Sequence, residues 1–419
     1  MGGGVAVVTA IAAPAAGPPS LLKRALLVAA ASRLGVFVTA VAATYLFRLG
    51  GALQRSRAPH AALPFAGVAA HLVNAWGNWD GAWYIRIAEH GYAAADNTAA
   101  FSPLLPLCVR GLGAALGGEY LIAGILIALA AYFAALVVLY RFVALDLEPH
   151  VAFWSVVFIS VFPTTFFFQA VYTEAPFLLL TLSCVYWSRK ARWWPAGLAG
   201  LLAVLTRTSA VLLVVPMAVY YLQQRGWRWP RTDRRLAAIA LAPLGLALWV
   251  VYLAAAFGQP LLFARAQGHW RRALTFPLVT LWRAAETAVD GARQVLSGQS
   301  AHAYFPIQPG GNVIGTAIEN LTAFVLLVGV VALFVYGLRR LPAAYSTWTL
   351  LAAGYPLFFP GRYVPLSSYA RFVLVAFPLF VAAAVLCERR PRLRAALLAL
   401  FTGGLIALTG MFAVYAWVA

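Results

Sequence analysis

Residues 236–257 read LAAIALAPLGLALWVVYLAAAF, a run without a single charged side chain. A helix that crosses a bilayer needs about 20 apolar residues, and open strands cannot satisfy their backbone hydrogen bonds in lipid. The whole chain is similar in character, since 63% of its 419 residues are hydrophobic, 10% are charged and the mean hydropathy is +0.82. A soluble domain carries about 25% charged residues. The sequence therefore predicts an all-α protein with several transmembrane helices.

The formal net charge of +19 does not indicate nucleic-acid binding, because the basic residues are not gathered on a soluble module. They cluster beside or between apolar runs, as cytoplasmic loops do under the positive-inside rule. The clusters lie at 23–24, 189–192, 225–235, 339–340 and 389–394. The three cysteines, Cys108, Cys184 and Cys387, have neither metal-binding nor redox spacing.

Between these clusters the apolar runs predict about ten or eleven spans, with the N-terminus in the cytoplasm. We expect one membrane-embedded domain over 1–419, with a loose tail at 1–20 and two long non-cytoplasmic loops at 49–118 and 258–317. Residues 102–118 should form a helix embedded in the outer leaflet. The expected spans lie near 21–47, 120–142, 151–168, 173–188, 236–257, 318–336, 343–360, 371–386 and 395–417.

Residues 193–222 are too long for one ordinary span, yet basic clusters lie at both ends. We expect a re-entrant segment that turns near Thr206-Arg207-Thr208, in preference to one long helix. This turn would carry Arg207 deep into the membrane region, where an arginine needs a partner or a polar cavity.

An aromatic and charged stretch, 78–92, follows the first span. Gly81 to His90 has the spacing of a short helix, with Gly91 as its C-terminal stop. Asp80 then has two interpretations. It could be the N-cap that accepts backbone N–H bonds, or the general base that takes a proton from an acceptor hydroxyl as this hydroxyl attacks the anomeric carbon of a sugar.

The motif Trp-Asp-Gly-Ala-Trp-Tyr at 79–84, followed by Phe-Ser-Pro-Leu-Leu-Pro at 101–106, resembles the first lumenal loop of the transferases that add the second mannose to glycosylphosphatidylinositol. The resemblance extends to bacterial relatives of that family. It continues through Tyr-Thr-Glu-Ala at 172–175 and Leu-Thr-Arg at 205–207. Weaker matches follow at Gln267 with 270–271 and at Ser368 with 371–372.

This resemblance implies a GT-C type glycosyltransferase in the cytoplasmic membrane. Such enzymes use a polyprenyl-phosphate sugar as donor and transfer it with inversion on the non-cytoplasmic face, with Asp80 as the catalytic carboxylate. Phe372 stands where the family usually has Tyr, and the acceptor, a glycan, glycolipid or glycoprotein, is left open. The substrate contacts expected are Trp79, Trp83, Tyr84, Arg86, Glu174, Arg207, Gln267, Trp270, Arg271 and Arg371.

Several of these residues have a second interpretation. Glu174 could favour the start of a helix that Thr173 caps, or it could contact a sugar hydroxyl. Arg207 could pair with a carboxylate, or it could hold the donor phosphate. The basic cluster 269–272 and Arg371 could anchor the protein to lipid headgroups, or they could clamp the same phosphate.

No grouping of His, Asp and Glu has the spacing of a closed metal site. We expect no cofactor and prefer metal independence, although Asp80 and Glu174 could share a divalent ion with substrate oxygens. The sugar is expected to be mannose, with arabinose or glucose as rivals. A transporter or flippase of lipid-linked sugars, with Arg207 and Glu174 along its path, is the alternative from a different class of protein.

Overall fold

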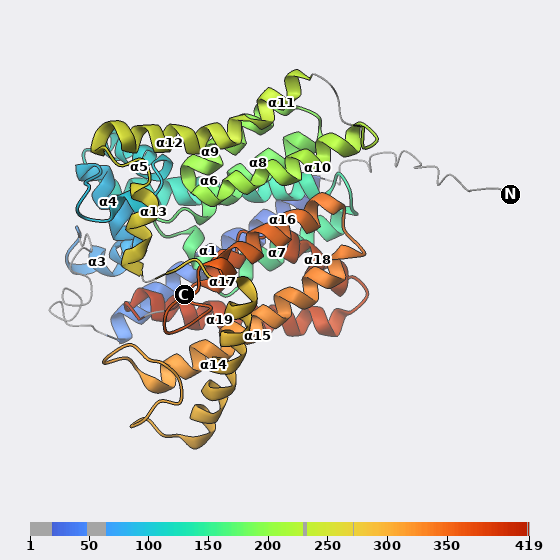
Figure 1. Cartoon of the computed structure of the whole chain (residues 1–419). Helices are drawn as coiled ribbons and strands as arrows, with labels where there is room; N and C mark the ends of the chain where they lie inside the picture. The colour runs from blue at the N-terminus through green and yellow to red at the C-terminus, as the bar shows by residue number, and fades with distance from the viewer. Residues whose placement is uncertain (1–18, 48–63, 229–232, 271, 417, 419) are drawn as a thin grey trace.

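The computed structural model describes residues 19–47, 64–228, 233–270, 272–416 and 418, and within them it contains helices and no strands (Figure 1). The all-α expectation is confirmed. The predicted tail 1–20 and the beginning of the first predicted outside loop lie largely outside the described residues.

Eighteen α-helices form the described part of the chain. Those of the first half are α1 (Pro19–Leu46), α3 (Gly67–Val73), α4 (Asp80–His90), α5 (Leu104–Ala115), α6 (Tyr120–Val143), α7 (Pro149–Val161), α8 (Glu174–Arg189), α9 (Trp193–Thr206) and α10 (Val214–Gln224). Those of the second half are α11 (Arg234–Ile239), α12 (Leu241–Phe257), α13 (Leu262–Ala266), α14 (Pro277–Ser297), α15 (Val313–Leu338), α16 (Ala343–Gly354), α17 (Tyr369–Val373), α18 (Pro378–Cys387) and α19 (Pro391–Ala413).

Among the described residues, four helices, α1, α6, α15 and α19, are each long and apolar enough to cross a membrane. A fifth span is possible if α12 and the segment 262–270, bent by 87° to each other, count as one. The other expected crossings are made of shorter apolar helices. The protein is thus a multi-pass membrane protein. Among the described residues, however, the helices long enough to cross a membrane number four or five, fewer than the ten or eleven spans expected.

Three pairs of shorter helices are broken pairs, in which a 3₁₀ turn or loop separates the two helices along the chain. The pairs are α7 with α8, α9 with α10, and α16 with α18. In the second pair the chain turns at Arg207, whose extended backbone (φ −150°, ψ 125°) ends α9. The two ends of this pair lie together, since the rings of Trp193 and Tyr221 are 5.5 Å apart. The structure therefore confirms the predicted turn near Arg207, with both ends of 193–222 on the same side of it.

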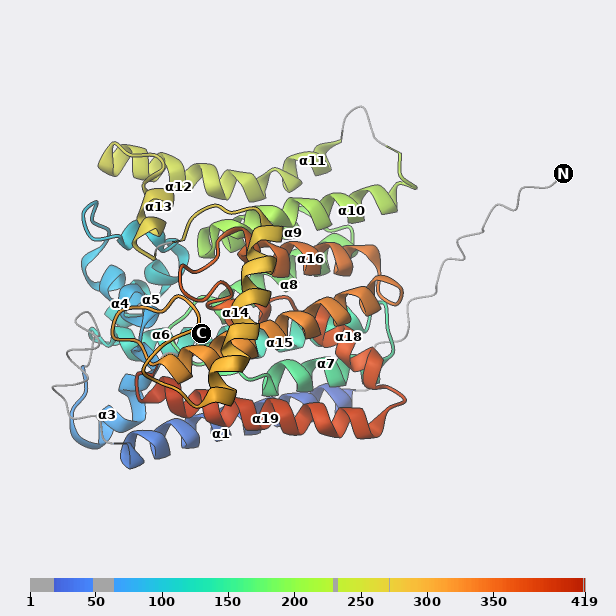
Figure 2. The ribbon, with the colours of Figure 1, turned by 60° about the horizontal axis from the view of Figure 1, so that its bottom comes forward.

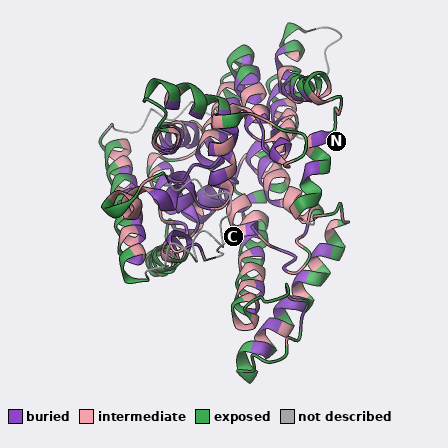
Figure 3. Ribbon diagram, turned by 90° about the vertical axis from the view of Figure 1, so that its left-hand side faces the viewer, coloured by how far each residue is buried: buried purple, intermediate pink, exposed green. Residues whose placement is uncertain are grey.

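Most helices of the two predicted outside loops gather at one end of the bundle, whereas α14 packs along α15 (Figures 1 and 2). Figures 1 and 2 show α3, α4, α5 and α13 on the left, whereas the turns after α10 and between α18 and α19 lie on the right. Basic residues such as Arg225 and Arg390 occupy the second end. Seen from the left-hand end, buried residues gather toward the middle of the bundle and exposed ones along its outside (Figure 3).

Glycines bring α9 into close contact with its neighbours. A Cβ atom at Gly197 would lie 2.0 Å from the carbonyl oxygen of Ala238, and one at Gly245 would lie 2.7 Å from that of Leu201. Small residues of this kind let helix backbones approach within a membrane. The helix that ends at Arg207 is thereby fixed against α11 and α12.

We predict that Gly197→Ala destabilises the protein by about 1–3 kcal/mol, because overpacking forces the two backbones apart. Gly329→Ala is the matched control, since a Cβ atom at Gly329 meets nothing within 4 Å and alanine favours a helix by about 0.5–1 kcal/mol over glycine. Thermal unfolding of the purified protein in detergent measures both changes. Equal effects of the two substitutions would contradict the close packing.

Candidate functional site

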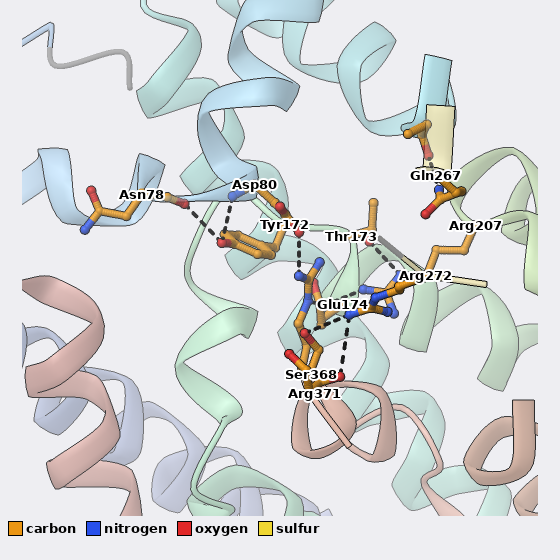
Figure 4. Close-up of polar contacts among 12 residues, drawn as sticks. Asn78, Asp80, Tyr172, Thr173, Glu174, Arg207, Gln267, Arg272, Ser368 and Arg371 are labelled. Carbon is orange, nitrogen blue, oxygen red and sulfur yellow. Dashed lines mark hydrogen bonds and ion pairs between the residues drawn. The ribbon is translucent and has the colours of Figure 1, made fainter. Parts of the chain in front are cut away.

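The site lies where the broken pairs meet the start of α4. Glu174 is the first residue of α8, Arg207 follows α9, and Arg371 lies within α17. Asp80 is the first residue of α4. Residues from four separate parts of the chain therefore converge on one place (Figure 4).

Glu174 binds two arginines. Its side chain has 0% exposure, and its Oε1 accepts a hydrogen bond from Nη2 of Arg207 and another from Nε of Arg371. Thr173 Oγ1 accepts from Nε of Arg207 at 2.7 Å. Thr173 is the N-cap residue of α8, as predicted, but its hydroxyl makes no cap bond to the helix and binds Arg207 instead. The alternative in which Arg207 pairs with a carboxylate is the one observed.

Arg371 links this pair to Asp80. Its Nη1 lies 2.5 Å from Oδ2 of Asp80, whose side chain keeps 26% exposure against 11% for Arg371. The N-cap of α4 is Trp79, and neither Trp79 nor Asp80 makes a side-chain cap bond to this helix. The N-cap interpretation of Asp80 is therefore wrong, and its carboxylate faces the arginine cluster. The predicted helix is confirmed, with Gly91 after its last residue at φ 82°.

A third arginine, Arg272, joins the cluster (Figure 4). Its Nη2 donates to Ser368 Oγ at 3.2 Å and to the carbonyl oxygen of Ser367 at 3.5 Å, so it has no carboxylate partner among the described residues. Three guanidinium groups therefore face two carboxylates, which leaves a surplus positive charge. An anionic ligand suits such a site. Arg271, which the motif match indicated, lies outside the described residues.

Two hollows flank the ion pairs. The first reaches Asp80 and is otherwise mostly aromatic. The second extends from Arg207. The first is lined by Trp79, Asp80, Phe167, Tyr172, Arg371, Phe412 and Val418. The second is lined by Phe177, Arg207, Ser209, Leu212, Trp348, Leu351, Ala352, Tyr355, Pro356, Phe372 and Val375.

Of the aromatic residues expected to contact substrate, only Trp79 lines the first hollow. Trp83 and Trp270 pack against Phe101, at ring distances of 5.8 and 5.5 Å. Tyr84 is buried against the same ring at 5.0 Å. Burial raises the pKa of Tyr84 to about 12, so this phenol stays protonated and does not compete with Asp80 as a base.

Arg86 and Gln267 hold the outer segments together and do not reach the arginine cluster. Arg86 forms an ion pair with Asp96 at 2.8 Å. Gln267 Nε2 donates to the carbonyl oxygen of Ala100 at 3.3 Å, which ties the second outside segment to the first. Neither residue lines the hollow at Asp80.

The sequence motifs did not single out Tyr172 as a site residue, although it belongs to the Tyr-Thr-Glu-Ala block. Its ring centroid lies 4.6 Å from the Arg371 guanidinium, and its hydroxyl contacts the backbone beside Asp80. Arg272 was recognised only as one member of a basic cluster. Its unusual feature was its position in a loop expected on the non-cytoplasmic side, where arginines are uncommon.

Comparison with known proteins gives a family match and two similar structures. A family model described as mannosyltransferase (PIG-V) matches residues 52–227. No curated protein matches the sequence. The oligosaccharyltransferase AglB from Archaeoglobus fulgidus, solved with an inhibitory peptide and a dolichol-phosphate, is 13% identical with a TM-score of 0.40. The Archaeoglobus fulgidus oligosaccharyltransferase tethered to an acceptor peptide is 13% identical with a TM-score of 0.43.

Each similarity covers 91% of this chain, which spans about half the length of those structures, 55% and 54%. The family match includes Asp80, Glu174 and Arg207, and it ends before Arg272 and Arg371. It confirms the resemblance that the motifs indicated. The chain is that of a multi-pass membrane protein, and over residues 52–227 it is similar to the family described as mannosyltransferase (PIG-V).

Proposed function

We propose that the protein transfers mannose from a polyprenyl-phosphate carrier to an acceptor hydroxyl at the non-cytoplasmic face of the cytoplasmic membrane. The observation that carries the proposal is Asp80, a carboxylate that caps no helix, stays partly exposed and lies beside three arginines. A base and an anion-binding site next to each other are what a sugar transfer from a phosphate requires.

In the proposed reaction, the oxygen of the acceptor hydroxyl forms a bond to the anomeric carbon of the sugar. Asp80 accepts the proton that this hydroxyl loses. The bond from this carbon to the phosphate oxygen breaks on the opposite side, so the configuration inverts. Asp80 Oδ2 is held by Arg371. Oδ1 accepts no hydrogen bond from another described residue, and we assign the proton to it.

The leaving phosphate would bind the guanidinium groups of Arg207, Arg272 and Arg371, whose positive charges outnumber the negative charges of the two carboxylates. Arg207 and Arg371 each use two nitrogens on protein partners, and Arg272 bonds only neutral groups. Guanidinium groups bind phosphate oxygens well and stabilise charge that develops on them. We propose on this chemistry that the transfer needs no metal ion or other cofactor.

The second hollow suits the prenyl chain of the donor. Its lining is apolar apart from Arg207, Ser209 and the Tyr355 hydroxyl. Arg207 belongs both to this lining and to the ion pairs, so a phosphate at Arg207 would place its lipid chain in the hollow. The acceptor would reach Asp80 through the first hollow.

The face of the membrane is inferred from the distribution of basic residues. The helices that carry the motif lie at one end of the bundle and the basic turns at the other (Figures 1 and 2). Basic loops stay in the cytoplasm, which puts Asp80 toward the non-cytoplasmic side. Glycans, glycolipids and glycoproteins are acceptors available there.

We predict that Asp80→Asn lowers the rate of sugar transfer by about 10²–10⁴-fold, the usual contribution of a general base. The amide keeps the size of the side chain but cannot take the proton. The assay follows release of polyprenyl phosphate from a labelled polyprenyl-phosphate mannose by the purified protein with cell-envelope acceptors. Glu89→Gln, an acid-to-amide change on the same helix, should leave the rate unchanged.

Full activity of Asp80→Asn would remove Asp80 from the chemistry. If the unaltered protein moves the intact donor across vesicles and never cleaves it, the protein is a carrier and the proposal fails. A donor that is cleaved only when it carries another sugar would keep the mechanism and change the substrate.

We predict that Ala352→Phe raises the KM for the polyprenyl-phosphate sugar about tenfold or more, because overfilling an apolar site costs about 1–3 kcal/mol. Ala352 lines the second hollow. Leu350→Phe is the control on the same helix, since Leu350 is 58% exposed and does not line the hollow. Steady-state kinetics with varied donor measure both. The same KM for both variants would mean that the lipid chain binds elsewhere.

A further inference from the structure

The hydroxyl group of Tyr172 closes the turn that carries Asp80. It donates to the carbonyl oxygen of Asn78 at 3.0 Å and accepts from the backbone N–H of Asp80 at 3.1 Å (Figure 4). Tyr172 is 1% exposed. Its two partners flank Trp79, so a single hydroxyl spans the turn from one side to the other.

This turn is strained, and the backbone N–H of Asp80, the first of α4, has no partner within the helix. Trp79 has φ 55° and ψ −122°, a conformation that residues other than glycine rarely adopt and that persists only when the surroundings impose it. The first N–H groups of a helix lack partners within the helix. The N–H groups of Gly81 and Ala82 donate to the carbonyl oxygens of Asn78 and Trp79. The N-cap residue makes no side-chain cap bond, and the Tyr172 hydroxyl is the partner of the Asp80 N–H.

Packing between the two segments reinforces this contact. The N–H of Val171 donates to the carbonyl oxygen of Trp76 at 2.9 Å. A Cβ atom at Gly81 would lie 3.5 Å from the Tyr172 ring, so the helix start rests directly on it. The Asn78 amide donates to the carbonyl oxygen of Phe412 at 2.9 Å, which fixes the other side of the turn.

The ring of Tyr172 also contacts the partner of Asp80. Its centroid lies 4.6 Å from the Arg371 guanidinium, within the range of a cation–π contact. One side chain thus touches the backbone of the carboxylate residue and the arginine that binds its Oδ2. Burial, and next the charge of Asp80, raise the pKa of Tyr172 well above its ordinary value, so the hydroxyl stays a proton donor to Asn78.

We propose that Tyr172 is a positioning residue that sets the direction in which the Asp80 carboxylate points. The inference rests on the proposed function, because it takes Asp80 to be the base. A carboxylate on an unrestrained turn would sample several directions, and a misplacement of about 1 Å can lower a rate about 100-fold. Tyr172 exchanges no proton with substrate; its hydroxyl acts through the turn at Trp79, and its ring packs on Arg371.

The test is Tyr172→Phe, which removes both hydrogen bonds and keeps the ring against Arg371. We expect kcat to fall about 10–100-fold, with the KM for the polyprenyl-phosphate sugar unchanged within about twofold, since the arginines remain. Tyr132→Phe is the matched control. It removes another buried hydroxyl, which donates to Ser160 Oγ at 2.9 Å outside the site, and it should leave kcat unchanged.

A double-mutant cycle separates positioning from general damage to the fold. In the Asp80→Asn background, Tyr172→Phe should have no further effect on kcat. A full additional loss there, or a kcat loss in Tyr132→Phe as large as that in Tyr172→Phe, would overturn the inference. Should Tyr172→Phe fail to fold, Asn78→Ala is the second variant. It loosens the same turn by removing the hydrogen bond from Asn78 to the carbonyl oxygen of Phe412, and it should likewise lower kcat and leave KM unchanged.

The two proposals fail in different ways. If Asp80→Asn keeps its activity, the base is another group and the proposed function is wrong in that respect. If Asp80→Asn is inactive while Tyr172→Phe retains full kcat, Asp80 remains the base and only the positioning role is lost.

Discussion

The buried carboxylate of Glu174 is the constraint on which the site depends. A charge that is removed from water must be paired, and an unpaired one costs several kcal/mol. Glu174 is paired with Arg207 from the turn after α9 and with Arg371 from α17. These ion pairs therefore hold the turn after α9 and helix α17, which are far apart in the sequence, together at the start of α8.

Asp80 differs from Glu174 in its access to a ligand. Both carboxylates bind Arg371, but Glu174 is fully buried whereas Asp80 keeps access to a hollow. The first is a fixed counter-ion for the arginines, and the second is free to meet a hydroxyl group. In the proposed reaction, the surplus charge of Arg272 and the apolar hollow beyond Arg207 would set where an anionic lipid binds relative to that carboxylate.

Much of this architecture could be predicted from local patterns. Uncharged runs and basic clusters indicated the membrane helices, and an apolar segment with basic ends indicated the turn at Arg207. The partners of that arginine were not predictable, because Glu174 lies 33 residues from Arg207 and 197 from Arg371. Trp83 and Trp270 looked like substrate contacts, since exposed aromatic residues suit an interface, but they pack on Phe101. Contacts between distant segments leave no periodic signal in the sequence.

The central claim is that one cluster of arginines holds the donor phosphate within reach of Asp80. The most direct test is a cryo-electron microscopy structure of the protein with a non-cleavable phosphonate analogue of a polyprenyl-phosphate mannose. The account predicts the phosphonate between Arg207, Arg272 and Arg371, the prenyl chain against Leu351 and Ala352, and the anomeric carbon facing Asp80. A phosphonate bound away from these arginines, or a sugar on the far side of them from Asp80, would contradict it.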